Sequence, residues 1–285
     1  MNFQTHLSIA GLGFRLETPA LPRVNEEFAP FLGQTDPEIP VAFNEVPAFS
    51  PLGEPLASMG LFDLYRTENG FLRDYVPRRR KIRSRVNSGS CRVQYLAGER
   101  PCASLRDCFL AIPLEELILD HGRMILHASC VETEFGGILF SGPSGVGKST
   151  QAELWRSFRN TPILNGDRVI LHRDGGRWMA SGSPYAGSSR YYVNRSVPVA
   201  TVVMLDQAPE EQLRALAPKE AFRLLYSQLL VNTWNPDFVE RVCDLAQAMI
   251  REIPILRLAC TPQERAVLAL EAWLKGGGTR GADHG

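Results

Sequence analysis

The middle of the chain carries a contiguous glycine-rich pattern, G-x-x-x-x-G-K-[ST]. The residues that form it are Gly142, Pro143, Ser144, Gly145, Val146, Gly147, Lys148 and Ser149, and Thr150 follows them. An apolar run at residues 137–141 precedes the pattern and a helical run at 149–158 follows it, which is the strand, loop and helix order that this motif requires. The pattern therefore predicts an α/β domain in which backbone N–H groups and a helix N-terminus converge on phosphate oxygens.

Two side chains of the loop have predicted roles. Lys148 is expected to reach the β- and γ-phosphates of ATP, and Ser149 offers a hydroxyl to Mg²⁺. The same loop also fits an alternative in which a glycine-rich turn between a strand and a helix binds nothing.

Composition and charge narrow the class of protein. The 285 residues include 31 basic and 31 acidic side chains, so no net charge favours nucleic acid or an anionic membrane as a partner. The six cysteines form no C-x-x-C pair and are interpreted as small buried hydrophobes. With neither a signal segment nor an apolar run of membrane length, we expect a cytoplasmic protein.

Residues 1–103 are predicted to form a β-rich N-terminal domain. Period-two alternation indicates strands at 7–16, 41–43, 60–65 and 86–96, separated by proline-rich linkers. A domain at 104–275 is expected to follow, beginning with a helical pattern, and the glycine-rich tail at 276–285 is predicted to be disordered.

The second domain alternates strands and helices. Strands are predicted at 124–131, 137–141, 162–164, 197–205 and 253–258, with a further hairpin that turns at Asp174-Gly175-Gly176. Helices are predicted at 149–158, 219–230 and 236–250. A last helix is expected to begin with a capping box in which Thr261 accepts from the backbone at Glu264, with Pro262 at the first helical position.

Phosphoryl transfer also needs an acid or base near the loop. Asp167 is the leading candidate as base and metal ligand, although Asn165-Gly166-Asp167 also reads as a simple turn. His127 lies within the apolar strand that precedes the loop strand, where a histidine is more often a hydrogen-bonded core residue than a functional one.

These residues resemble the HPr kinase/phosphorylase-like group, which is related to ATP-dependent phosphoenolpyruvate carboxykinases. The likeness covers residues 120–206: the strand with His127, the strand 137–141, the loop, and Asn165-Gly166-Asp167-Arg168. It implies a P-loop domain with a mixed sheet resembling the HPr kinase C-terminal core. Together with the β-rich N-terminal domain, which the alternation predicts and the likeness does not cover, the expected fold class is α/β. The likeness also implies that Asp167 abstracts the acceptor hydroxyl proton and that His127 lines the same site.

The sequence departs from that family at two positions. Gly166 stands where the family often has a second aspartate, and Thr150 stands where the bifunctional enzymes typically have glutamate. The phosphorylase half-reaction is therefore left open. The segment 182–187 (GSPYAG) looks like a loop of HPr-kinase-like proteins found beside peptide-modifying enzymes, and Arg190 and Arg195 beyond it are candidates to stabilise phosphoryl charge.

A basic run at residues 78–85 (RRRKIRSR) could contact an acidic peptide or a nucleic-acid backbone, but a solvated strand face or loop fits it better and no nucleic-acid reading module accompanies it. The resulting hypothesis is an ATP- and Mg²⁺-dependent kinase that phosphorylates a serine or similar hydroxyl of a peptide or protein. The alternatives are a nucleotide-binding accessory protein that presents a peptide without transfer, and a small-molecule kinase. Oligomerisation is possible and stays open.

Overall fold

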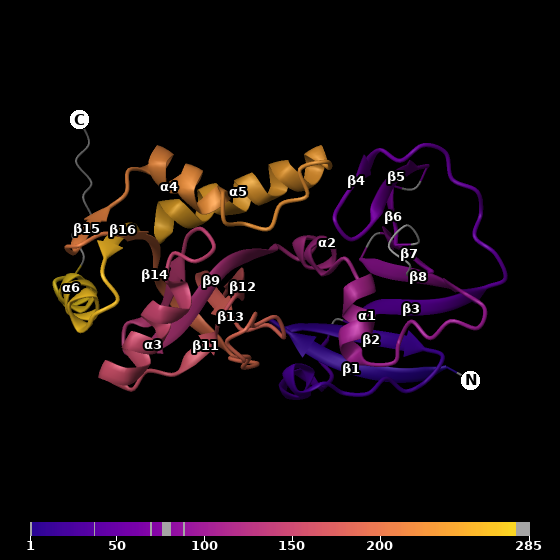
Figure 1. Cartoon of the computed structure of the whole chain (residues 1–285), viewed down its shortest axis with the longest axis horizontal. Coiled ribbons are helices and arrows are strands. Elements are labelled where there is room, and N and C mark those ends of the chain that lie inside the picture. Colours follow the sequence, from indigo (N-terminus) through magenta and orange to yellow (C-terminus); the bar gives the residue numbers. More distant parts are fainter. Residues whose placement is uncertain (1, 37, 69, 76–80, 88, 278–285) are drawn as a thin grey trace. The chain divides into compact units, whose positions relative to one another are not determined.

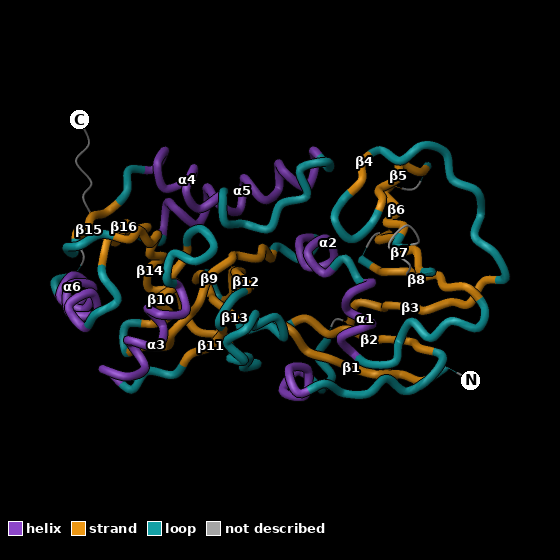
Figure 2. The backbone as a smooth tube through the Cα atoms, viewed as in Figure 1, coloured by secondary structure: helices purple, strands orange, loops and turns teal. Residues whose placement is uncertain are grey.

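The computed structural model describes residues 2–36, 38–68, 70–75, 81–87 and 89–277. The chain divides into two compact units, Met1–His121 and Gly122–Gly285, and each contains one large mixed sheet (Figures 1 and 2). The expectation of a mixed α/β protein with a β-rich first part is therefore confirmed. Most of the predicted tail, residues 278–285, lies outside the described residues.

The first unit is built on an eight-stranded sheet with the order β1-β2-β3-β8-β7-β6-β5-β4. Its strands are β1 Phe3–Ile9, β2 Leu12–Thr18, β3 Glu38–Val46, β4 Ala57–Ser58, β5 Asp63–Thr67, β6 Gly70–Asp74, β7 Ile82–Asn87 and β8 Ser90–Leu96. Only the central pairs β2–β3 and β3–β8 are parallel, and the other pairs are antiparallel. A short 3-10 helix, η1 Glu26–Phe31, buries Phe28 and Phe31.

Two strands predicted in this unit are hairpins instead. The run 7–16 is broken at Ala10 and Gly11, whose φ values of 51° and 72° turn the chain between β1 and β2. Successive positive φ values suit a two-residue hairpin turn, but Ala-Gly is a weak turn signal beside Asn-Gly or Asp-Gly. The run 86–96 likewise spans the end of β7 and all of β8.

The helices α1 Leu105–Ala111 and α2 Leu114–Leu119 belong to the first unit, so the division lies after His121 and not after residue 103. Ser104 caps α1 by accepting a hydrogen bond from the backbone of Asp107. The ring of Phe109 lies 5.0 Å from that of Phe28. Arg73 of β6 forms buried ion pairs with Glu115 and Glu116 of α2. These contacts join the two helices to the first sheet. The change from a strand to a helix pattern after residue 103 therefore does not mark the division between the units.

Residues 78–80 of the basic run lie outside the described part, and two of its described cations, Lys81 and Arg83, form ion pairs. Arg83 on β7 forms an ion pair with Asp74 at 3.0 Å, and its guanidinium lies over the ring of Phe49. Lys81 pairs with Glu99 at 2.8 Å. These two side chains therefore belong to local ion pairs of the first sheet.

The second unit contains a sheet in the order β10-β9-β12-β13-β14-β16-β15, with β11 paired to β9. Its strands are β9 Arg123–Thr133, β10 Gly136–Ser141, β11 Ile163–Asn165, β12 Arg168–Asp174, β13 Arg177–Ser181, β14 Ser196–Gln207, β15 Gln212–Ala215 and β16 Ile255–Cys260. The long strands β9 and β14 each change partners along their length, and β10 pairs with both of them. The parallel strands β10, β14 and β16 end at the same edge of the sheet, which is where the glycine-rich loop begins.

The helices of this unit are α3 Lys148–Arg159, α4 Pro218–Tyr226, α5 Pro236–Glu252 and α6 Glu264–Lys275. Helices α3 and α6 share an apolar core with one face of the sheet, formed by Val131, Ile138, Phe140, Ala152, Trp155, Ile163, Val203, Leu205, Leu256, Leu258, Cys260, Ala266, Val267 and Leu270. All six cysteines are unpaired, and all except the half-buried Cys243 are buried. Within the described residues, no helix combines the length and the apolar character needed to cross a membrane.

Two predicted helix boundaries in this unit are wrong. The helix predicted at 219–230 ends at Tyr226, because the next residues pair with β9: His127 N donates to Gln228 O and Leu230 N donates to Ile125 O, both at 2.9 Å. The predicted capping box at Thr261 does not form. The Thr261 hydroxyl donates to Glu211 at 2.8 Å, and α6 begins at Glu264 without a side-chain cap.

Candidate functional site

The glycine-rich loop connects β10 to α3, in the strand, loop and helix order that the sequence predicts. Gly142, Gly145 and Gly147 have φ values of 145°, 80° and 115°, a region that favours glycine. Gly147 is the N-cap of α3 and has no side chain to bond the first-turn N–H groups. The loop thus leaves the positive end of a twelve-residue helix available to an anion.

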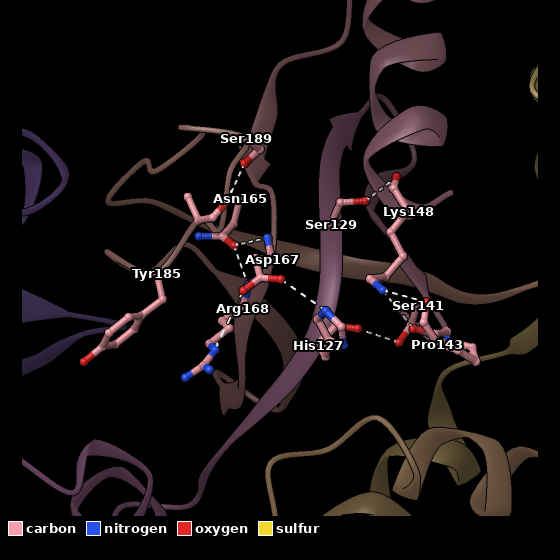
Figure 3. A network of polar contacts seen from close by, with 12 residues as sticks. His127, Ser129, Ser141, Pro143, Lys148, Asn165, Asp167, Arg168, Tyr185 and Ser189 are labelled. Carbon is pink, nitrogen blue, oxygen red and sulfur yellow. Dashed lines mark hydrogen bonds and ion pairs between the residues drawn. The ribbon is translucent and has the colours of Figure 1, made fainter. Parts of the chain in front are cut away.

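The side chain of Lys148 is held over this loop by backbone carbonyls of the loop. Its side-chain Nζ donates to the carbonyls of Gly142 at 2.9 Å and Pro143 at 3.0 Å, and the residue is only 8% exposed. The hydroxyl of Ser129 on β9 donates to the Lys148 carbonyl at 2.7 Å (Figure 3). Burial lowers the pKa of Lys148 below its ordinary value, and the charge of Asp167 acts in the opposite direction. The cation is therefore fixed in place without a carboxylate in direct contact among the described residues.

The other polar side chains of the loop region face solvent. Ser144, Ser149 and Thr150 are exposed, and the last two lie in the first turn of α3. No group of three His, Cys, Asp or Glu side chains among the described residues could hold a metal ion. Mg²⁺ in nucleotide sites needs few protein ligands because phosphates and waters supply the rest. One hydroxyl from Ser149 and one carboxylate from Asp167 are compatible with that kind of site.

His127 and Asp167 form a pair beside the loop (Figure 3). The His127 Nε2 lies 3.1 Å from Asp167 Oδ1. The Asn165 side-chain oxygen accepts from the backbone N–H groups of Asp167 at 2.9 Å and Arg168 at 2.8 Å, and Ala128 N donates to the Asp167 carbonyl at 2.9 Å. These bonds fix the turn between β11 and β12, so the carboxylate of Asp167 is held against β9.

The protonation of His127 depends on both neighbouring charges. Burial lowers its pKa below the ordinary value of 6.5, the positive charge of Lys148 lowers it further, and Asp167 acts in the opposite direction. At neutral pH the imidazole is therefore uncharged, and its Nε2–H can donate to Asp167. Since the unfolded chain binds this proton more readily, the contribution of His127 to stability falls as the pH drops below 6.5.

An NMR titration of the imidazole signals tests this electrostatic arrangement. We expect a midpoint for His127 below 6.5, a lower midpoint in Asp167→Asn, because the negative charge that favours the imidazolium is lost, and a higher midpoint in Lys148→Ala. A midpoint that stays the same in both variants would contradict the arrangement.

Position 166 has room only for glycine, because the side chain of Ser189 packs against it. A Cβ atom at position 166 would lie 1.7 Å from the Ser189 hydroxyl oxygen and 2.5 Å from its Cβ. The same hydroxyl donates to the Ala186 carbonyl at 2.6 Å, which holds the segment 182–190 in place. In that segment Gly187 has a φ of 57°, and a Cβ there would lie 3.1 Å from the Asp167 Cβ. The space of a second acidic side chain is thus occupied by Ser189.

We expect Gly166→Ala to lower the free energy of unfolding by about 1–3 kcal/mol, the usual cost of overpacking. Ser189→Gly should recover part of this loss in the double variant, whereas Ser189→Ala should recover less because its Cβ still clashes. Urea unfolding followed by tryptophan fluorescence is the measurement, because all four tryptophans lie in the second unit. Additive effects of the two substitutions would contradict the steric coupling.

The two candidate arginines have different surroundings. Arg195 forms an ion pair with Glu132, which lies opposite Gly137 at the far end of β10. Five strand residues, about 16 Å, separate Glu132 from His127, so the structure does not bring Arg195 to the site. Arg190 is exposed with a φ of 60°, follows Ser189 directly, and makes no side-chain hydrogen bond or ion pair with a described residue.

Sequence reasoning missed the supporting roles of Ser129, Ser141 and Asn165. The Ser141 hydroxyl donates to the His127 carbonyl at 2.8 Å, and Asn165 also donates to the Ser183 carbonyl at 2.9 Å. The alternation of Ile125, His127 and Ser129 on one face of β9 could have indicated Ser129. The bond from Asn165 to Ser183 joins residues that are distant in sequence, so it left no such signal.

Comparisons with known proteins found similarity among solved structures. No family model and no curated protein matches the chain. Among solved structures, the Hpr(Ser) kinase/phosphatase from Coxiella burnetii is similar with a TM-score of 0.33 and 14% sequence identity, over 54% of this chain and 89% of that chain.

Proposed function

We propose that this protein is an ATP-dependent phosphotransferase that phosphorylates a serine or similar hydroxyl of a peptide or protein. One observation carries the proposal. A buried lysine and an uncapped helix N-terminus, both suited to phosphate, lie beside an aspartate that is held in place by a histidine and an asparagine side chain. The lysine and the helix N-terminus can bind a nucleotide, and the aspartate can accept the proton of the acceptor hydroxyl.

The loop would bind the ATP phosphates. Its backbone N–H groups and the N-terminus of α3 offer donors and partial positive charge, and Lys148 would leave its two loop carbonyls to contact the β- and γ-phosphates. Ser149 and Asp167 would hold Mg²⁺, which when bound neutralises phosphate charge. Gly142, Pro143, Ser144, Gly145, Val146, Gly147 and Thr150 would shape the cradle around these groups.

Asp167 would act as the base. Its Oδ1 faces His127, so the other oxygen, Oδ2, is the one that can take the acceptor proton. The acceptor oxygen then bonds to the γ-phosphorus while the bond from that phosphorus to the bridging oxygen breaks, and ADP leaves with the electron pair. Neutral His127 would orient the carboxylate, and the exposed guanidinium of Arg190 would stabilise charge on the transferred group.

A second candidate function rests on Gly166. Because Ser189 fills the space of a second carboxylate, the turn offers one acidic side chain for both metal binding and proton transfer. A protein that binds ATP and presents a peptide without transferring phosphate would fit this reduced set. A small-molecule kinase would share the loop and Asp167 and would differ in its acceptor. The unpaired cysteines suit a cytosolic setting for any of the three.

Label transfer from ATP separates these functions. The full chain is incubated with γ-labelled ATP, Mg²⁺ and a library of serine-containing peptides, and nucleotide binding is measured in parallel by calorimetry. We expect labelled phosphopeptide. ATP binding without transfer to any peptide would overturn the peptide-kinase proposal and leave the accessory function and the small-molecule kinase.

A further inference from the structure

A pocket beside Asp167 shares that residue with the predicted nucleotide site and is otherwise lined by residues outside the glycine-rich loop. Its volume is about 270 Å³, and it is lined by Ile125, His127, Asp167, Arg168, Ser227, Gln228, Leu229 and Leu230. One wall is the extended segment 228–230, whose backbone pairs with β9. The opposite wall carries Asp167 and Arg168, where β12 begins.

The pocket and the loop lysine lie on opposite sides of His127 along β9. Alternate residues of a strand share a face, so Ile125, His127 and Ser129 point the same way at intervals of about 6.6 Å. Ser129 contacts Lys148, while Ile125 lines the pocket. The His127–Asp167 pair therefore stands between the phosphate-binding end and the pocket, which is the order that in-line transfer from a donor to an acceptor requires.

The size of the pocket limits what it can admit. A volume of about 270 Å³ corresponds to about nine water molecules and lies just below the about 300–1,000 Å³ of pockets that bury a drug-sized ligand. One amino-acid side chain with part of its backbone fits this space.

The pocket offers one cationic contact to a ligand, beside the carboxylate of Asp167. Among the described residues that line it, Arg168 is the one cationic side chain. Its Nε lies 3.8 Å from Asp167 Oδ2, beyond hydrogen-bond distance, and its guanidinium lies 5.5 Å from the ring centre of Tyr185. The side chain is 46% exposed, so it can turn its donors toward a carboxylate.

We propose that this pocket is the acceptor subsite and that it selects a hydroxyl residue with a carboxylate side chain next to it, as in an acidic peptide. The inference rests on the proposed function. The hydroxyl would enter between Leu229 and Asp167, and Arg168 would bind the neighbouring carboxylate. The backbone of 228–230, anchored to β9, would keep the opening at a constant width.

The test uses three short peptides that share one serine and differ only in its neighbour, which is aspartate, asparagine or lysine. Transfer from labelled ATP gives kcat/KM for each peptide, and calorimetry gives binding without transfer. The variant Arg168→Gln removes the proposed carboxylate contact. Its matched control is Arg173→Gln, on the same strand but outside the pocket and paired with Glu252.

We expect wild type and Arg173→Gln to prefer the aspartate peptide over the asparagine peptide about tenfold, the effect of one charge-assisted hydrogen bond. In Arg168→Gln this ratio should fall to about one. Efficient transfer with no charge preference, or a preference unchanged in Arg168→Gln, would overturn the subsite proposal and leave the kinase proposal intact. Binding of the aspartate peptide that is lost in Arg168→Gln, with no transfer in any protein, would support the subsite and overturn the kinase activity. No binding and no transfer would overturn both.

Discussion

Replacing Lys148 with alanine is expected to weaken ATP binding and to lower kcat/KM for phosphoryl transfer about 10²–10³-fold. The physical reason is the position of the ammonium group. It is buried above the loop, bonded to the carbonyls of Gly142 and Pro143, and not neutralised by a carboxylate in direct contact among the described residues. A phosphate oxygen that replaces these carbonyls would contact a fixed positive charge. Because that charge is shielded from solvent, the electrostatic contact would be strong.

The matched control for this variant is Lys219→Ala. Lys219 is exposed on the first turn of α4, so its removal takes away the same charge without touching the loop. Calorimetry with ATP and steady-state transfer are the measurements, and urea unfolding checks that both variants fold. A Lys148→Ala protein that binds ATP as tightly as wild type would contradict the assignment of the loop.

Asp167→Asn is expected to lower kcat for transfer about 10²–10⁴-fold, the usual contribution of a general base, while ATP binding changes much less. Asparagine has nearly the same shape as aspartate, and the backbone bonds of residue 167 to Asn165 and Ala128 do not involve the side chain. The turn should therefore persist while the base is lost. The effect should appear in kcat because the proton is removed only in the transition state.

Asp174→Asn is the control for that substitution. Asp174 is exposed at the end of β12, seven residues after Asp167. Single-turnover measurements with labelled ATP separate the chemical step from product release. Wild-type transfer rates in Asp167→Asn would exclude Asp167 as the base, and loss of ATP binding in this variant would indicate that its main role is in holding the nucleotide.

Much of the second unit could be predicted because its signals are local. The strands β9 and β10, the helix α3 and the hairpin at Gly175 and Gly176 each depend on a pattern within a few residues. The predictions failed where a distant partner decided the conformation. Residues 228–230 continue an apolar helical pattern, yet they are extended because β9 offers backbone partners to them. Thr261 has the sequence of a helix cap, but Glu211 takes its hydroxyl.

The candidate site divides in the same way. The contiguous residues 142–149 determined by themselves that a glycine-rich loop would join a strand to a helix, because each glycine and the lysine act through the local backbone. Only the tertiary structure decided which side chains surround that loop. It brought His127 within 3.1 Å of Asp167, placed Ser189 where Gly166 leaves space, and kept Arg195 with Glu132. These pairs are set by strand register and by packing between segments far apart in the chain, and neither is encoded in a local pattern.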